Sequence, residues 1–301
     1  MKKTEKLAVN GMLLSTSMLW GSAYSYRKIA LLYMGSFFFN AWRFFLAFLI
    51  LVVAYIIADA FRRWRGEESS YAPVRWQIEK GFIIGIVLSF GVNVQQLGLI
   101  TSDAGKCGFI TSLYIFFTPM LAKLIFKKQI PVKIWFGASI AVAGLFCISW
   151  GSDFKIVVGD ALFVATALFY AMHLILLGMW CGKSSPILLV CVQALTCCVM
   201  SAGLSLVFES GNSMENLMSA IWPVIYTGVF TIALSNIIHA AAQKKVSPSL
   251  AAIILSFESV FGALFAALII GERMNSPQIM GCGLIFLAII SSQLEKKAKN
   301  C

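Results

Sequence analysis

Long apolar runs with few charged residues recur along the whole of this 301-residue chain. An α-helix needs about 20 predominantly apolar residues to cross about 30 Å of hydrocarbon. Ten such runs can be separated by short polar or Gly/Pro-bearing segments, at approximately residues 9–28, 36–58, 81–100, 104–126, 132–151, 157–180, 186–208, 219–242, 249–270 and 276–294. The sequence therefore predicts an all-α polytopic membrane protein with ten transmembrane helices and no aqueous domain.

Charge content and charge placement both favour this interpretation. Only 12% of the residues are charged, whereas soluble domains carry about 25%. With the N-terminus in the cytoplasm, 17 of the 24 Lys and Arg residues fall in cytoplasmic segments and five fall outside, namely Arg27, Lys28, Lys106, Lys155 and Arg273. Cytoplasmic loops are enriched in Lys and Arg. The net charge of +11 is thus explained by topology with both termini cytoplasmic, and it requires no nucleic-acid partner.

A weak internal repeat relates the two halves of the chain. At an offset of 144 residues, Ser112-Leu113-Tyr114 aligns with Ser256-Phe257-Glu258, and Gly137 aligns with Gly281. Because each half holds an odd number of helices, five, the halves must have opposite orientations in the membrane. Inverted repeats with a site near the midplane are a transporter architecture. We therefore predict two inverted five-helix repeats, over residues 1–152 and 153–301.

Several short motifs, taken in order, cover nearly the whole chain. They are Leu19-Trp20-Gly21-Ser22, Trp42-Arg43-Phe44, Thr111-Ser112-Leu113-Tyr114, Phe117-Thr118-Pro119, Gly159-Asp160-Ala161-Leu162, Ser256-Phe257-Glu258 and Gly271-Glu272-Arg273. This ordered set resembles the EamA-type transporters of the drug/metabolite transporter superfamily. Lys128 and Ser259 depart from the acidic residue and the proline that are usual there. The resemblance implies a bacterial-type inner-membrane carrier, often an exporter of amino acids or other small metabolites, with a cavity between its halves.

Polar and aromatic residues recur at helical spacing on several of the predicted spans and form stripes on otherwise apolar cylinders. Such groups are expensive in hydrocarbon unless they are paired or face a hydrated cavity. We expect the stripes to surround a substrate cavity. The candidate substrate-binding residues are Trp20, Tyr24, Asn93, Gln96, Tyr114, Tyr170, His173, Asn236, His239 and Glu258.

Each candidate also has a purely structural explanation. Thr111, Thr166 and Thr231 are more simply explained by bonds to their own i−4 carbonyls. Asn93 and Gln96 fit a helix–helix hydrogen bond as well as a substrate contact. Trp20 and Tyr24 could instead belong to an interfacial aromatic belt. His173 could be a hydrogen-bonded histidine of the core.

Three charged residues lie inside predicted spans. Glu258 is near the middle of the ninth, where a carboxylate must be paired, hydrated or protonated. Its structural alternative is a buried ion pair, for instance with Arg43 or Lys123. Arg43 fits structural pairing as well as anion binding, and Lys123 is close enough to its helix end to extend to the interface.

The remaining chemistry narrows the function to transport. The eight cysteines form no CxxC motif and there are only two histidines, so neither a zinc site nor another cofactor is predicted. No phosphate-binding loop is present, so a carrier would draw on a proton or ion gradient, or on the gradient of its substrate. An amino acid, an amine or a drug-like solute would fit, with a slight preference for cationic or aromatic molecules. A membrane-embedded enzyme acting on a lipid-linked substrate and an ion channel are the alternatives, and the oligomeric state stays open.

Overall fold

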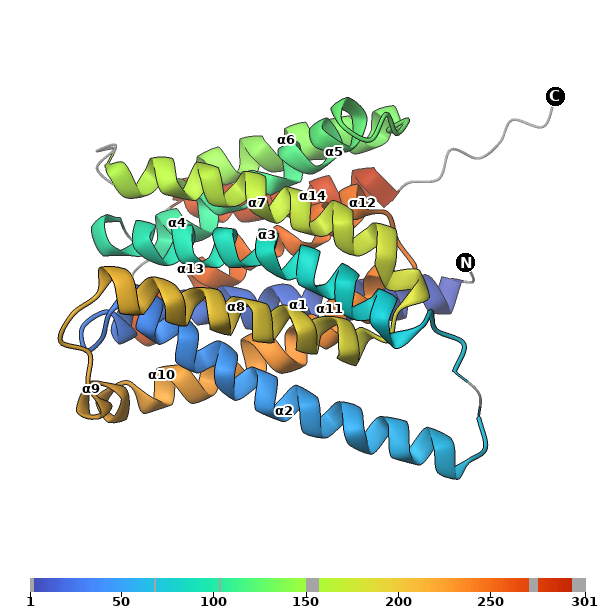
Figure 1. The fold of residues 1–301 in the computed structure, drawn as a ribbon. Coiled ribbons are helices and arrows are strands. Elements are labelled where there is room, and N and C mark those ends of the chain that lie inside the picture. The colour runs from blue at the N-terminus through green and yellow to red at the C-terminus, as the bar shows by residue number, and fades with distance from the viewer. Residues whose placement is uncertain (1–2, 68, 103, 150–156, 271–275, 294–301) are drawn as a thin grey trace.

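The computed structural model describes residues 3–67, 69–102, 104–149, 157–270 and 276–293, and the regular elements in these ranges are all helices (Figure 1). They are α1 (Lys3–Ala30), α2 (Ser36–Trp64), α3 (Val74–Thr101), α4 (Ala104–Thr111), α5 (Tyr114–Leu124), α6 (Val132–Ser149), α7 (Val158–Trp180), η1 (Cys181–Lys183), α8 (Pro186–Phe208), α9 (Met214–Ser219), α10 (Ile221–Tyr226), η2 (Thr227–Leu234), α11 (Ser235–Gln243), α12 (Pro248–Leu255), α13 (Phe257–Ile270) and α14 (Ser276–Gln293). Glu272, Arg273 and Cys301 lie outside the described residues. The first helix begins and the last one ends at the same end of the bundle, called here the N-terminal end.

Within the described residues, seven helical segments are long and apolar enough to cross a membrane, and two shorter apolar helices, Val132–Cys147 and Ile279–Ala288, accompany them. Although α1 has 28 residues, it is not among the seven. Its hydroxyl-bearing residues explain this, because Thr16, Ser17, Ser22 and Ser25 are buried against other helices. A helix that is enclosed by protein does not need an apolar surface. The number of ten spans therefore stays a prediction.

The helix contacts follow the division of the chain into two halves. α2 packs on α8, and α6 packs on α14, which are the pairs that the predicted repeat relates. The contact of α3 with α7 has its counterpart in α1 with η2 and α11. The contact of α1 with α13 likewise has its counterpart in α7 with α4 and α5. Exchanging the two halves of the chain thus maps the α2–α8 and α6–α14 contacts onto themselves and the other contacts onto each other.

Two predicted spans are interrupted where the sequence suggested continuous helices. α4 ends before Ser112-Leu113 and α12 ends before Ser256, which are the positions that the repeat aligned. At both breaks serine hydroxyls bond to nearby carbonyl oxygens: Ser112 Oγ donates to Gly108 O at 2.8 Å and Ser256 Oγ to Ile253 O at 2.8 Å. Serine competes in this way with the helical ladder. The two breaks meet, because Ser112 Oγ lies 2.6 Å from Ser259 Oγ.

Small residues allow α6 and α14 to approach closely. Ala141 and Ala288 are fully buried, and a Cβ added to Gly144 would lie only 2.8 Å from the carbonyl oxygen of Gly281. α1 and α13 make a second close contact, where a Cβ on Gly21 would lie 2.5 Å from the carbonyl oxygen of Glu258. Small residues at a helix–helix contact let the backbones approach closely, which is how helices associate in a membrane.

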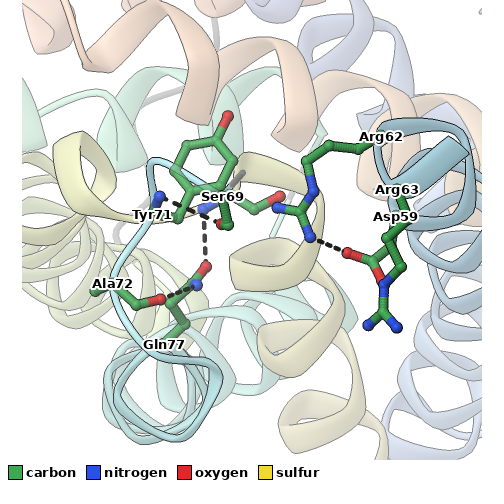
Figure 2. Close-up of polar contacts among 8 residues, drawn as sticks. Asp59, Arg62, Arg63, Ser69, Tyr71, Ala72 and Gln77 are labelled. Carbon is green, nitrogen blue, oxygen red and sulfur yellow. Dashed lines mark hydrogen bonds and ion pairs between the residues drawn. The ribbon is translucent and has the colours of Figure 1, made fainter. Parts of the chain in front are cut away.

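At the N-terminal end, the loop between α2 and α3 is held by Gln77 (Figure 2). Its side-chain amide donates to Ala72 O at 2.6 Å and accepts from the backbone N–H of Ser185 at 2.8 Å. In the last turns of α2, Asp59 pairs with Arg62 and Arg63 (Figure 2). Ion pairs and hydrogen bonds of a side-chain amide therefore hold the N-terminal end of the bundle.

At the opposite end, Glu209 after α8 holds the beginning of α2. Its two carboxylate oxygens accept the backbone N–H groups of Phe37 at 2.8 Å and Phe38 at 2.9 Å. A carboxylate at a helix N-terminus satisfies free N–H donors and complements the helix dipole. Asn216 donates to Tyr33 O at 2.7 Å nearby, so the loops at this end are tied together across the two halves.

Candidate functional site

A cavity lies in the middle of the bundle, and both halves of the chain contribute to its wall. The space that no protein atom fills, counted together with its opening to solvent, is about 700 Å³. Helices α1, α2, α3 and α5 supply one part of the wall, and α7, η2, α11 and α13 supply the other. The lining residues are Trp20, Ala23, Tyr24, Arg27, Arg43, Phe44, Leu88, Val92, Gln95, Tyr114, Tyr170, His173, Leu174, Thr231, Ile232, Asn236 and Glu258.

One side of the wall is built on the wide turns of η2, a π-helix. The indole N–H of Trp20 donates to Thr231 O at 3.2 Å and to Ser235 Oγ at 2.9 Å. The ring of His239 packs edge-on against the Trp20 ring, with 5.3 Å between centroids. Short π-helical segments are rare and are found frequently at functional sites. Here the segment brings backbone oxygen and hydroxyl groups to the indole in the cavity wall.

Arg27 is held by neutral side chains of α3. Its Nε donates to Gln96 Oε1 at 2.9 Å, and its Nη1 donates to Gln95 Oε1 at 2.6 Å. The same Gln95 oxygen accepts from Tyr170 Oη at 2.8 Å, and the Gln95 amide donates to Thr111 Oγ1 at 3.0 Å. This chain of hydrogen bonds links α1, α3, α4 and α7, and so fixes the position of the guanidinium group.

Arg43 of α2 has an equivalent anchor. Its Nε donates to Asn40 Oδ1 at 2.9 Å, and its guanidinium carbon lies 5.2 Å from the ring centroid of Phe39 and 5.1 Å from that of Phe44. Asn40 in turn donates to Asn93 Oδ1 at 2.9 Å. The Arg43 side chain is therefore oriented by an amide and by cation–π contacts.

Glu258, at the start of α13, is 2% exposed and lies where the two helix breaks meet. Ser112 Oγ donates to Glu258 Oε1 at 3.3 Å. The ion pair that the sequence left open is absent: Arg43 bonds to Asn40, Lys123 is exposed, and no ion pair joins Glu258 to a described Lys or Arg. Its carboxyl group is thus held by a hydroxyl beside the cavity.

Seven of the ten candidate residues line the cavity, namely Trp20, Tyr24, Tyr114, Tyr170, His173, Asn236 and Glu258. The other three lie behind the wall. Asn93 receives hydrogen bonds from Asn40 and from Ser201, whose Oγ is 3.0 Å away, so the helix–helix alternative describes it better. Gln96 bonds to Arg27, and His239 supports Trp20. Whether the seven contact substrate stays a prediction.

The structural explanations given for the three threonines and for His173 hold in part. Thr166 and Thr231 donate to their i−4 carbonyls at 2.9 and 2.7 Å. Thr111 instead accepts from Gln95, on a neighbouring helix. His173 both lines the cavity and bonds through Nε2 to Gln193 Oε1 at 2.9 Å, so it is a hydrogen-bonded core histidine with one face on the cavity.

Four polar residues of the wall are not among the ten candidates: Arg27, Arg43, Gln95 and Thr231. For Arg43 the sequence had left anion binding open as an alternative. Arg27 belonged to the polar stripe of the first span, but its position near the helix end suggested an interfacial charge. Its side chain is in fact 5% exposed. The stripe on the third span predicted Gln96 and overlooked its neighbour Gln95, because a helix surrounded by protein is polar on more than one face.

The cavity offers charge, hydrogen bonds and aromatic surfaces for binding a small solute. Among the described residues, no group of three or more His, Cys, Asp or Glu side chains could hold a metal ion. The wall of the cavity supplies guanidinium, carboxyl, amide and aromatic groups.

The sequence matches the model of the EamA-like transporter family over residues 8–150 and again over 157–292. An uncharacterized transporter of Archaeoglobus fulgidus is 30% identical over 274 residues, which cover 91% of this chain and 82% of that protein. The uncharacterized transporter YyaM of Bacillus subtilis is 21% identical over 289 residues, covering 93% and 92% of the two chains.

One solved protein structure has a similar fold, with a TM-score of 0.74 over 95% of this chain and 96% of that chain. The sequences are 14% identical, so this likeness concerns the fold alone.

Proposed function

Because the chain belongs to the EamA-like transporter family, and so is a multi-pass membrane transporter and not an enzyme, we propose that it works as a secondary carrier of small metabolites. In this proposal, the two halves of the chain are inverted five-helix repeats that rock around the central cavity. Access to the cavity then alternates between the two sides of the membrane. The resemblance to exporters favours outward transport.

The observation that carries the proposal is the composition of the cavity wall. Both halves of the chain contribute helices to it, and its carboxyl residue Glu258 lies where the breaks of α4/α5 and α12/α13 meet. Interrupted helices at the interface of two repeats are the usual position of a transporter site. The family match in two stretches, 8–150 and 157–292, supports the division at residues 152 and 153.

The proposed topology has ten spans, with both termini in the cytoplasm of a bacterial-type plasma membrane. It rests on the 17 basic residues assigned to the cytoplasmic side against five outside. In this orientation the N-terminal end of the bundle, with Arg62 and Arg63, faces the cytoplasm. The end with Glu209 faces outward.

The proposed substrates are amino acids, amines or drug-like solutes. Trp20, Tyr24, Phe44 and Tyr170 offer aromatic faces, while amide and charged groups can fix polar ends of a ligand. Glu258 is the group proposed to carry a proton or to recognise a cationic group, because it is the one carboxyl group in the wall.

Reconstitution into lipid vesicles tests the carrier mechanism. Radiolabelled L-phenylalanine and phenethylamine provide an amino acid and an amine with the same ring. We expect saturable uptake of at least one of them, accelerated counterflow when the unlabelled compound is inside, and no requirement for ATP. Empty vesicles are the control. Flux that rises linearly with concentration and shows no counterflow would identify a channel instead.

A further inference from the structure

Two buried guanidinium groups share the cavity and have no carboxylate partner. Arg27 is 5% exposed and Arg43 is 3% exposed, and both line the wall. Their hydrogen-bond partners are the amide oxygens of Gln95, Gln96 and Asn40, which are neutral. Among the described residues, neither guanidinium group therefore has a carboxylate within ion-pair distance.

Both arginines are oriented in the same way, through Nε. Nε of Arg27 and Nε of Arg43 each donate to an amide oxygen at 2.9 Å. Nη2 of Arg27 is buried without a hydrogen-bond partner. Among the described residues, no acceptor bonds to Nη1 or Nη2 of Arg43. Donors on the outer edges of two guanidinium groups thus remain available in one cavity.

Burying a charge is costly unless an opposite charge or strong hydrogen bonds compensate it. A planar guanidinium group matches the two oxygens of a carboxylate or the edge of a phosphate, with two parallel N–H···O bonds. The carboxyl group of Glu258 does not fill this role, because it forms no ion pair with either arginine and is held by Ser112.

We propose that Arg27 and Arg43 form an oxyanion site in the cavity, and that the transported solute carries a carboxylate or a similar oxyanion which they bind. This inference rests on the proposed carrier function and defines its substrate class. It reverses the slight preference for cations that the sequence suggested. Glu258 lines the same cavity without an ion pair to either arginine, and is then left to contact a cationic group of the same solute or to take up a proton.

Three compounds with one phenyl ring separate the charge requirement from ring binding. They are 3-phenylpropionate, an anion, L-phenylalanine, a zwitterion, and phenethylamine, a cation. Each is titrated against the purified full-length protein while the unfolding temperature is measured. A ligand of the folded state raises the apparent stability with concentration. We expect 3-phenylpropionate and L-phenylalanine to raise the unfolding temperature, and phenethylamine to raise it less.

The Arg43→Gln variant should weaken the response to 3-phenylpropionate at least about tenfold in concentration, because a charged hydrogen-bond partner is lost. Arg27→Gln should do the same. Arg43→Lys keeps the charge but loses the planar fork, and should restore only part of the response. The matched control is Arg63→Gln, which removes an arginine whose side chain is 78% exposed; it should respond like the unchanged protein.

The outcomes for the anion site and for the carrier are distinct. An unchanged response to 3-phenylpropionate in both Gln variants, or no response of the unchanged protein to either carboxylate, overturns the oxyanion site. If phenethylamine binds and shows counterflow while the two carboxylates do neither, the oxyanion site is overturned and the carrier is supported. A carboxylate that binds through both arginines without any counterflow in vesicles supports the site and contradicts the carrier.

Discussion

The cavity wall and the contact between α6 and α14 are two places where the halves of the chain meet, and they are built by opposite rules. The wall carries large polar and aromatic side chains, and two of them, Arg27 and Tyr114, have a buried polar atom without a partner. The α6–α14 contact is lined by Ala141, Gly144 and Ala288, whose surfaces are small and apolar. The cavity wall leaves polar atoms without hydrogen-bond partners, and the α6–α14 contact leaves no space between the helices.

This difference separates residues that hold the protein together from residues that act on a solute. In a membrane, helices associate through close packing, because lipid is as apolar as the helices themselves. Added volume should therefore harm the α6–α14 contact most. Removal of charge should harm the cavity wall most, where the charged side chains Arg27, Arg43 and Glu258 line the cavity.

The largest expected effect is on stability, from Gly144→Leu. The first added carbon already lies 2.8 Å from Gly281 O and 3.0 Å from the side chain of Leu284, so α6 and α14 must separate. Overpacking of this kind costs about 1–3 kcal/mol or more. The unfolding temperature in detergent and the yield of monodisperse protein measure the loss. Gly283→Leu, on α14 with nothing within 4 Å of an added Cβ, is the control. Equal behaviour of the two variants would contradict the close packing.

The next effect is on transport, from Glu258→Gln. Shape is retained and Ser112 can still donate to the amide oxygen, but the group can no longer ionise. We expect a near-normal yield and a loss of transport of about tenfold or more, as for one charge-assisted interaction. The measurement is the initial rate of uptake into vesicles at pH values from about 5.5 to about 8.5. A carboxyl group that takes up a proton during transport should make this rate depend on pH. Glu215→Gln, on the exposed surface of α9, is the control.

Two outcomes would contradict this role of Glu258. A poor yield would indicate a structural role, because a buried polar group left without its hydrogen-bond partner costs about 1–3 kcal/mol. Full uptake with an unchanged dependence on pH would remove Glu258 from the transport cycle.

The smallest effect is expected from cysteines that only report the orientation of the two ends of the bundle. Ser210 lies at the end with Glu209, and Ser70 lies in the loop at the N-terminal end; both are exposed. Ser210→Cys should react with an impermeant thiol reagent on intact cells, whereas Ser70→Cys should react only after the membrane is opened. The reverse labelling pattern would show that the two ends of the bundle face the opposite sides of the membrane from those proposed.

The helical, membrane-spanning character of the chain could be predicted because it depends on composition along short stretches. The breaks at Ser112 and Ser256 were not predicted as interruptions, although the repeat had aligned them. A serine in a span can bond to its own helix without breaking it, as Thr166 does. Only the meeting of two such positions, with Ser112 Oγ 2.6 Å from Ser259 Oγ, distinguishes these breaks.

The candidate site was predicted where polar residues recur at helical spacing. Trp20 and Tyr24 on α1 and Tyr170 and His173 on α7 do line the cavity. Asn93 has the same spacing but lies behind the wall, since spacing identifies a polar face and does not tell whether water or another helix covers it. Arg27 was overlooked for the converse reason: near a helix end, its charge could have extended to the interface.

The sequence by itself determined that this protein is a helical membrane transporter, because hydrophobicity and family motifs are properties of local segments. Only the tertiary structure decided which buried polar groups find partners. Those partners come from distant parts of the chain: Trp20 bonds to Ser235, and Arg27 bonds to Gln96. A polar atom has its bonds satisfied, or stays available to a ligand, according to which helices are neighbours in space, and helical periodicity contains no information on that.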